Sequence, residues 1–255
     1  MAGPTEHRSQ PGSKPSTLHA ILPIAKPMTL SDRAQTYVST LIRDKDWTIS
    51  DPQEIADYLS RQTIPAFEGV IEFQKYYSGL QLTVTSKPGQ AFKASLFSNA
   101  DFVANKQITY NIINGQYYFD CGDHETAQFW FVVRQDGKIG TRDNAANATN
   151  IIHSSFDKFI ETYSLNDLLS RKKVYEYPAF FEVKNEELFN LLTADFHADK
   201  AASDEYNKWL FNDDLTIHQG TWYDRPSAYI HVSGLDKGQC NDFVNLLIDK
   251  QIVST

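Results

Sequence analysis

The sequence predicts an α+β fold in which N-terminal helices pack on an antiparallel sheet and a small α/β domain follows. Three observations support this prediction. Apolar side chains recur at helical spacing early in the chain, short runs of β-forming residues come next, and strand and helix patterns alternate in the last third. The expected organisation is a tail over residues 1–28, an α+β domain over 29–172 and an α/β domain over 173–255.

The first 28 residues differ in composition from the rest of the chain. They hold five of the ten prolines, and Arg8, Lys14 and Lys26 against Glu6 give them a net charge of +2. Proline fixes φ and removes a backbone donor, so this density predicts a flexible tail instead of a helix or strand. The alternative is that part of this segment is a cloning remnant.

Three helices are expected before the first strand. The first covers about 29–42, where apolar residues recur every three or four positions. The second starts at Ser50, whose hydroxyl and Gln53 have the spacing of a capping box. The third runs from about Pro65 to Ser78, where a Ser-Gly pair ends it.

Five strands are expected to form an antiparallel meander, because Asn-Gly and Asp-Gly turn signals at 114 and 136 keep the connections short. A helix opened by a capping box of Ser154 and Asp157 is expected to close this part. The predicted strands are 80–84, 91–97, 107–113, 116–120 and 127–133.

The pattern after residue 178 predicts a second set of elements. Its helices are expected at 185–194, 202–211 and 236–249, and its strands at 179–184, 215–222 and 227–233, with a short strand at the end.

A group of chemically reactive side chains lies between two predicted strands, and consists of Asp120, Cys121, Asp123, His124 and Glu125. One interpretation is a metal or acid–base site. Zinc sites draw three or four ligands from more than one element, and no second cysteine lies nearby, so a polar strand connection is the favoured interpretation. A third interpretation is a recognition surface, since loops often carry binding.

His218 and His231 are expected to face each other across a hairpin over 215–233. They could be a ligand pair, but without a third ligand an ordinary cross-strand contact is favoured. The sequence has no phosphate loop of the Walker type and no G-x-S-x-G elbow, so no metal and no cofactor are expected.

The net charge of −8 disfavours nucleic acid as a partner, because binding it requires lysine and arginine. Nine acids against three lysines give the segment 179–215 a net charge of −6, which predicts either a solvated surface or a field that attracts a basic partner. Two cysteines, no signal-peptide core and no apolar run of about 18 residues predict a cytoplasmic protein without a membrane span.

The order and spacing of these elements resemble the SUKH superfamily over residues 29–172. The stretch "IPAFEGVIEFQKYYSGLQL" (64–82) is similar to that family's Pro-led helix before the first strand. The stretch "CGDHETAQFWFVVRQDGKIG" (121–140) resembles its central hairpin, and "IIHSSFDKFIETY" (151–163) resembles its closing helix. The segment after residue 173 and the proline-rich tail depart from the family pattern.

The resemblance implies a non-catalytic immunity protein of a polymorphic toxin–antitoxin system. Such a protein binds a cognate toxin, for example a nuclease with a basic cleft, and covers its active site. The alternatives are a regulatory adaptor that binds a partner without neutralising it, and a hydrolase that uses Asp120, Cys121 and His124. The residues expected to bind the partner are Tyr117, Tyr118, Asp120, Asp123, His124, Glu125, Trp209, Asp213, Asp214, Trp222 and Tyr223.

Overall fold

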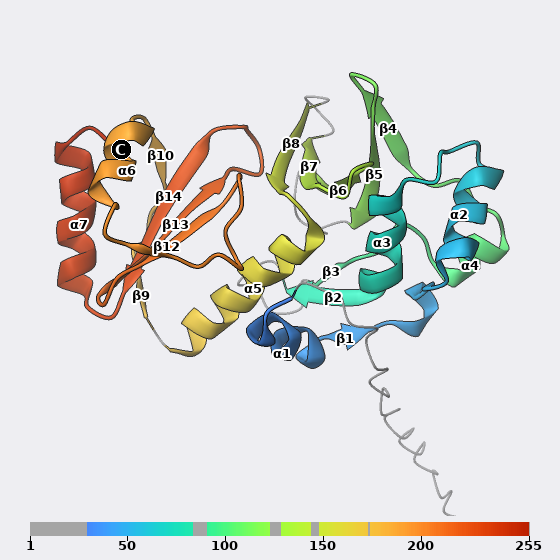
Figure 1. Cartoon of the computed structure of the whole chain (residues 1–255), viewed down its shortest axis with the longest axis horizontal. Helices are drawn as coiled ribbons and strands as arrows, with labels where there is room; N and C mark the ends of the chain where they lie inside the picture. The colour runs from blue at the N-terminus through green and yellow to red at the C-terminus, as the bar shows by residue number, and fades with distance from the viewer. Residues whose placement is uncertain (1–29, 84–90, 123–128, 144–147, 173, 255) are drawn as a thin grey trace, which may run out of the picture.

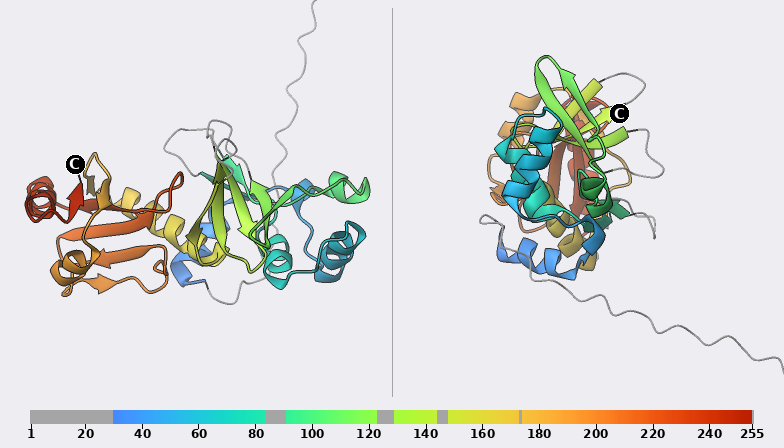
Figure 2. Two further views of the ribbon diagram at one scale, coloured as in Figure 1. Left: turned by 90° about the horizontal axis from the view of Figure 1, so that it is seen from above. Right: turned by 90° about the vertical axis from the view of Figure 1, so that its right-hand side faces the viewer.

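The computed structural model describes residues 30–83, 91–122, 129–143, 148–172 and 174–254. The predicted tail over 1–28 therefore lies outside the described residues. The molecule is elongated, with a seven-stranded sheet at one end and a five-stranded sheet near its middle (Figure 1). Helix α5 (Phe156–Arg171) runs between the two sheets, and α1 (Asp32–Thr40) lies beside it in both views (Figures 1 and 2).

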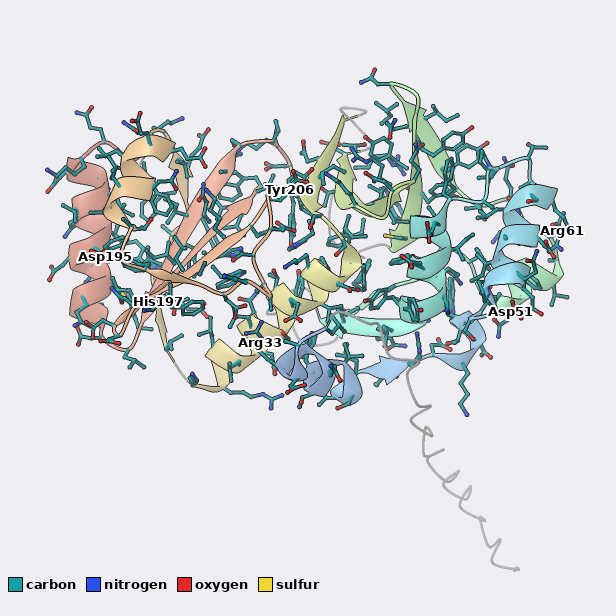
Figure 3. All side chains as sticks on the ribbon, viewed as in Figure 1. Arg33, Asp51, Arg61, Asp195, His197 and Tyr206 are labelled. Carbon is teal, nitrogen blue, oxygen red and sulfur yellow. The ribbon has the colours of Figure 1, made fainter. Side chains whose placement is uncertain are left out.

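The expected N-terminal helices are present, but their starts and ends differ from the prediction. Helix α1 ends before Leu41, and the chain passes into strand β1 (Ile42–Arg43). Helix α2 (Pro52–Arg61) is capped by Asp51 and not by Ser50, because the Asp51 carboxylate accepts the backbone N–H groups of the first turn (Figure 3). A carboxylate there also suits the helix dipole. Helix α3 (Glu68–Tyr77) begins three residues later than expected.

A three-stranded sheet follows, in the order β1-β2-β3. Strand β2 (Leu80–Thr83) lies where it was expected, whereas β3 (Ala91–Lys93) is shorter than the predicted strand over 91–97. The next residues instead form helix α4 (Asn99–Val103), which starts with a capping box. A short 3₁₀ helix (Lys45–Trp47) completes this part.

The five-stranded sheet is an antiparallel meander with the order β4-β5-β6-β7-β8. The predicted meander is correct only in its last three strands, because the predicted strands 80–84 and 91–97 lie in the separate three-stranded sheet. Asn114 and Gly115 both have positive φ, which is the geometry of the tight hairpin turn that their sequence indicates. The last two strands were not predicted. The strands are β4 (Tyr110–Ile113), β5 (Gln116–Gly122), β6 (Phe129–Arg134), β7 (Ile139–Asp143) and β8 (Ala148–His153).

The C-terminal part is α+β, so the prediction of an α/β domain is wrong. Every strand pair of its sheet is antiparallel, in the order β11-β12-β13-β14-β10-β15 with β9 also on β14. Its elements are β9 (Tyr175–Glu176), β10 (Phe181–Val183), α6 (Glu186–Leu192), β11 (His197–Ala198), β12 (Lys208–Phe211), β13 (Leu215–Thr221), β14 (Ala228–Gly234), α7 (Lys237–Asp249) and β15 (Val253–Ser254).

The predicted helix over 202–211 is also wrong. Residues 208–211 form β12, whose backbone pairs with β13, and the residues before it form a loop. Trp209 is buried against Leu165 and Leu169 of α5. Tertiary contacts of this kind override a short helical pattern, because a strand places alternate residues on opposite faces.

The glycine at the start of α3 permits a backbone-to-backbone contact. A Cβ at Gly69 would lie 2.5 Å from the backbone nitrogen of Gly137, in the turn between β6 and β7. Replacing Gly69 by alanine would favour an isolated helix by about 1 kcal/mol. Here we expect the opposite sign, a loss of roughly 2 kcal/mol in the free energy of unfolding, because the helix must move away from the turn. Urea denaturation measures the difference, and a gain in stability would contradict this packing.

Candidate functional site

A cleft of about 660 Å³ lies between the seven-stranded sheet and the helices α1 and α5. Hollows of this size that combine aromatic and polar walls are the usual places for ligands, so we take it as the candidate functional site. We call it the histidine cleft, after His153, His218 and His231. Its other lining residues are Tyr37, Thr40, Leu41, Ile152, Thr162, Tyr163, Asn166, Asp167, Leu169, Ser170, Glu176, Phe180, Asn207, Trp209, Thr221, Tyr223, Tyr229 and Ser233.

Strand alternation explains why one wall of the cleft is polar. Ile217 of β13 pairs with Val232 of β14, and both belong to the apolar core shared with α7. The next pair, His218 and His231, points to the opposite face, because successive side chains of a strand alternate. Trp209 of β12 pairs with His218, so the floor of the cleft is one row of rings across three strands.

Two ring stacks cover this floor, and the second includes Phe180, which lies just before β10. The Trp209 and His218 ring centres lie 3.9 Å apart with nearly parallel planes, and Phe180 stacks on His231 at 4.4 Å. Trp209 is only 3% exposed, and its indole nitrogen Nε1 has no hydrogen-bond partner among the described residues. A buried donor without an acceptor costs free energy, so this N–H lowers the stability of the floor of the cleft.

A chain of hydrogen bonds joins three elements behind this floor. The Asn207 amide Nδ2 donates to Ile152 O at 2.5 Å, and this carbonyl can only accept, which fixes the amide orientation. Nδ2 therefore also donates to His153 Nδ1, and His218 Nε2 donates to Asn207 Oδ1, each at 3.1 Å. The Tyr229 hydroxyl completes the chain by donating to His218 Nδ1 at 3.4 Å.

The three imidazoles are neutral at pH 7. Burial lowers the pKa of His153 to about 4, and the Asp204 carboxylate, 3.9 Å from Nδ1, offsets only part of this shift. Burial also lowers the pKa of His218 and that of His231. His153 and Asp204 are therefore a neutral ring beside a carboxylate and not an ion pair.

The tyrosine hydroxyls of the cleft stay protonated. Burial raises the pKa of Tyr163, Tyr223 and Tyr229, and it raises the pKa of Tyr37 to about 12 with a contribution from Asp167. The Tyr163 and Tyr223 hydroxyls hydrogen-bond to each other at 3.0 Å. The rings of the cleft are thus uncharged and present π faces.

The charged residues of the lining are all acidic. Asp167 of α5 and Glu176 of β9 contribute carboxylates, and no lysine or arginine lines the cleft among the described residues. Asp167 forms an ion pair with the exposed Arg171, one helical turn later, and the guanidinium nitrogen lies 2.8 Å from the carboxylate oxygen. An exposed pair of this kind contributes little, so both carboxylates can interact with a bound group.

Arg33 holds the helical wall in place. Its guanidinium contacts Glu161 of α5 at 3.0 Å and Asp199, beyond β11, at 2.5 Å, and it donates to Ser164 at 3.1 Å. Ser31, the N-cap of α1, donates to the same Glu161. Figure 3 shows Arg33 where α1, α5 and the C-terminal part meet. The spacing between helices and sheet, and hence the width of the cleft, depends on this contact.

The structure brings together part of the predicted partner-binding set. Trp209 and Tyr223 line the cleft. Trp222 lies behind it, packed on Tyr229 and Phe180 at 5.0 and 5.9 Å between ring centres. Three predicted residues therefore gather around one site: Trp209 of β12 and the neighbours Trp222 and Tyr223, which follow β13.

The other predicted residues lie elsewhere. Tyr117 packs on the N-terminal core, Tyr118 is buried, and Asp120 forms an ion pair with Arg142 of β7. Asp213 and Asp214 are exposed in the turn between β12 and β13. Asp123, His124 and Glu125 lie outside the described residues.

Asp120 and Cys121, the described members of the reactive group that lies between two predicted strands, do not face each other as a pair of catalytic groups. Asp120 contacts Arg142 through both carboxylate oxygens, at 2.9 and 2.8 Å, whereas Cys121 is fully buried in the core. Burial raises the pKa of the Cys121 thiol, which keeps it protonated. Within the described part of the chain, no group of three or more histidine, cysteine or acidic side chains is arranged to hold a metal.

His218 and His231 do pair across the hairpin, as predicted, but each has its own partner. His218 hydrogen-bonds to Asn207, and His231 donates to Tyr177 O at 3.0 Å. The pair is therefore a cross-strand contact within a wall of the cleft. Sequence reasoning missed the site residues His153, Asn207 and Tyr229, although polar residues that alternate with buried isoleucine and valine are a usable signal.

The acidic segment 179–215 does not form one surface. Asp199 and Asp204 hold structural contacts, and three glutamates pair with lysines. The acids that are exposed and have no ion pair within the described residues are Glu187, Asp195, Asp213 and Asp214.

Comparisons with known proteins give no relative for this fold or site. A scan against protein-family models, a search of curated proteins and a search of solved structures each returned no match. Among the helices that the structure describes, none combines the length and apolarity that crossing a bilayer requires.

Proposed function

We propose that this protein is a non-catalytic binding protein that neutralises a basic partner protein, the immunity function that the SUKH resemblance implies. The histidine cleft is the place where a cationic side chain of the partner binds. The observation that carries the proposal is the composition of the lining, which combines two carboxylates with stacked aromatic rings and has no lysine or arginine among the described residues.

A cation gains from each wall of this cleft. Aromatic faces attract an ammonium or guanidinium group by about 0.5–2 kcal/mol, and more when water is excluded. Neutral imidazole nitrogens do not repel it, and Asp167 and Glu176 lie in the lining to balance its charge. An anionic ligand would meet two carboxylates, of which Asp167 has the exposed Arg171 beside it, and no cation in the lining, so a basic partner is the better match.

The test is co-purification of the tagged protein from its native host, followed by identification of the partner and measurement of its affinity. Replacing Asp167 by Asn and Glu176 by Gln together is expected to weaken binding at least tenfold, or about 1.4 kcal/mol. Replacing Asp213 and Asp214 by Asn removes the same charge from an exposed turn and serves as the matched control. It is expected to change the affinity less than threefold.

Two outcomes would contradict the proposal. Equal losses in both double variants would mean that only net charge matters, and an acidic partner whose binding ignores salt would exclude a cation in the cleft. An assay of the partner's toxicity separates neutralisation from the adaptor alternative, because an adaptor leaves that activity unchanged.

A further inference from the structure

We propose that the cation held by the histidine cleft is the guanidinium group of an arginine, stacked on Phe180 and paired with Glu176. This inference rests on the proposed function and deepens it, because it names which of the two basic side chains the cleft selects. A lysine still binds in the cleft, but with a lower affinity.

Phe180 offers a flat π surface to the cleft. One face of its ring stacks on His231, with the ring centres 4.4 Å apart and the planes 18° from parallel. The rings of Tyr229 and Trp222 meet it at angles of 80° and 57°, so neither lies flat on its other face. Phe180 remains 50% exposed, and it lines the cleft. A planar group that enters the cleft can therefore lie against this ring.

Strand register places a carboxylate beside the same ring stack. Glu176 of β9 lies opposite Ser233 of β14, which is two residues from His231, so all three side chains share one face of the sheet. Such a diagonal neighbour lies roughly 7–8 Å away. Burial lowers the pKa of His231, and its hydrogen bond to Tyr177 O and the Glu176 carboxylate offset part of this shift, which agrees with a negative charge near the ring. Glu176 is exposed and has no ion pair within the described residues, so its carboxylate is available to a ligand.

A guanidinium group fits this arrangement better than an ammonium group. Arginine carries a planar and weakly hydrated cation, which can stack on a ring through its face and bind a carboxylate through two N–H groups at its edge. Lysine carries a compact, strongly hydrated charge without a flat face. Because Phe180 and Glu176 are both open to water, the ammonium keeps much of its hydration and gains less from the ring. We expect arginine to bind roughly tenfold more tightly than lysine.

The test is a titration of the full chain with N-acetyl-arginine amide, N-acetyl-lysine amide and N-acetyl-citrulline amide. The citrulline side chain is planar like that of arginine but carries no charge. Binding is read from the ring resonances of Phe180, assigned with a Phe180→Leu variant. We expect the arginine derivative to saturate the site at roughly one tenth of the concentration that the lysine derivative needs. The citrulline derivative is expected to give no saturable shift.

Two variants assign this preference to its residues. Phe180→Leu keeps an apolar side chain but removes the ring, so it is expected to reduce the affinity for the arginine derivative to that for the lysine derivative. The indole N–H resonance of Trp209 reports on this variant, and its unchanged position without ligand shows that the floor of the cleft is intact. Glu176→Gln is expected to weaken binding of the arginine derivative about fivefold. Glu187→Gln removes the same charge from an exposed position on α6 and is expected to change the affinity less than about twofold.

The results separate a failure of this inference from a failure of the proposed function. Equal affinities for the arginine and lysine derivatives, or a preference for arginine that persists in Phe180→Leu, would overturn the inference and leave a cation-binding cleft. A citrulline derivative that binds as tightly as the arginine derivative would remove the proposed function, since the charge would not matter. No saturable shift with either cation would also remove the proposed function, and the inference with it.

Discussion

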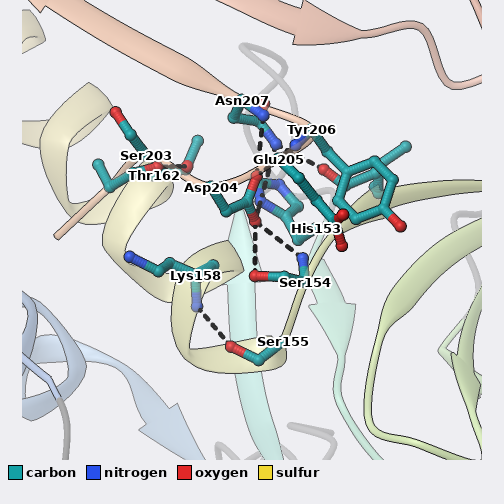
Figure 4. A network of polar contacts seen from close by, with 12 residues as sticks. His153, Ser154, Ser155, Lys158, Thr162, Ser203, Asp204, Glu205, Tyr206 and Asn207 are labelled. Atoms are coloured by element: carbon teal, nitrogen blue, oxygen red, sulfur yellow. Dashed lines mark hydrogen bonds and ion pairs between the residues drawn. The ribbon is translucent and has the colours of Figure 1, made fainter. Parts of the chain in front are cut away.

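Replacing Asp204 by alanine is expected to lower the free energy of unfolding by about 3–4 kcal/mol. The carboxylate is 4% exposed and accepts four hydrogen bonds, from the backbone N–H and hydroxyl of Ser154 and from the backbone N–H groups of Tyr206 and Asn207, at 2.8–3.0 Å. Figure 4 shows that these bonds join the loop before β12 to the start of α5. Alanine leaves all four donors without this acceptor, and unpaired buried donors are costly.

Two further variants sharpen this prediction. Asparagine at position 204 keeps one acceptor oxygen and is expected to lose about half as much stability. Alanine at the exposed Asp213 is expected to change the stability by less than about 0.5 kcal/mol. Guanidinium denaturation at pH 7 measures all three, and a loss below 1 kcal/mol for the Asp204 variant would show that this contact does not hold the cleft together.

Acidification of the wild-type protein from pH 6.5 to pH 4 is expected to lower its free energy of unfolding, and His153 alone accounts for roughly 3 kcal/mol of this loss. The pKa of His153 is about 4 in the folded protein against 6.5 for the free side chain. Between these values the unfolded chain binds a proton that the folded chain excludes, so stability is complete above pH 6.5 and falls as the pH falls. The lowered pKa of His218 and of His231 adds to the effect in the same direction.

Histidine variants isolate this contribution from that of the carboxylates. Glutamine at position 153 can still accept a hydrogen bond from Asn207 but does not titrate, so the loss of stability between pH 6.5 and pH 4 is expected to shrink by about the amount assigned to His153. The same change at the exposed His197 is the matched control and is expected to have little effect. Equal pH dependence in the wild type and both variants would mean that buried neutral histidines do not control acid stability.

The sequence allowed three strands of the meander and most helices to be predicted, because their signals are local, whereas the expected capping residues were each one position early, with Asp51 in place of Ser50 and Ser155 in place of Ser154. Asn114-Gly115 and Asp136-Gly137 mark two turns, and periodic apolar residues mark α1, α3 and α5. The strand at 208–211 was missed, because its identity depends on β13 and on the burial of Trp209 against α5. Local propensity does not contain such information.

The cleft itself was beyond sequence reasoning for a different reason. His153, Asn207 and Tyr229 come from β8, a loop and β14, and only the packing of α5 against the C-terminal sheet brings them together. Trp209 and Tyr223 were predicted to bind a partner as aromatic anchors, and the structure shows them in the same cleft. The burial of Trp209 and the hydrogen bond of the Tyr223 hydroxyl both depend on α5, and a local sequence pattern does not reveal how that helix packs.

The measurement that tests the central claim most directly is a titration of the full chain with N-acetyl-lysine amide and with its uncharged analogue N-acetyl-norleucine amide. The indole N–H resonance of Trp209, assigned among the four tryptophans with a Trp209→Phe variant, reports on the cleft. A cation-binding cleft predicts a saturable shift of this resonance with the lysine derivative, no shift with the norleucine derivative, and loss of the response when Asp167 and Glu176 are neutralised. An equal response to both compounds, or none to either, would contradict the claim that the histidine cleft binds a cation.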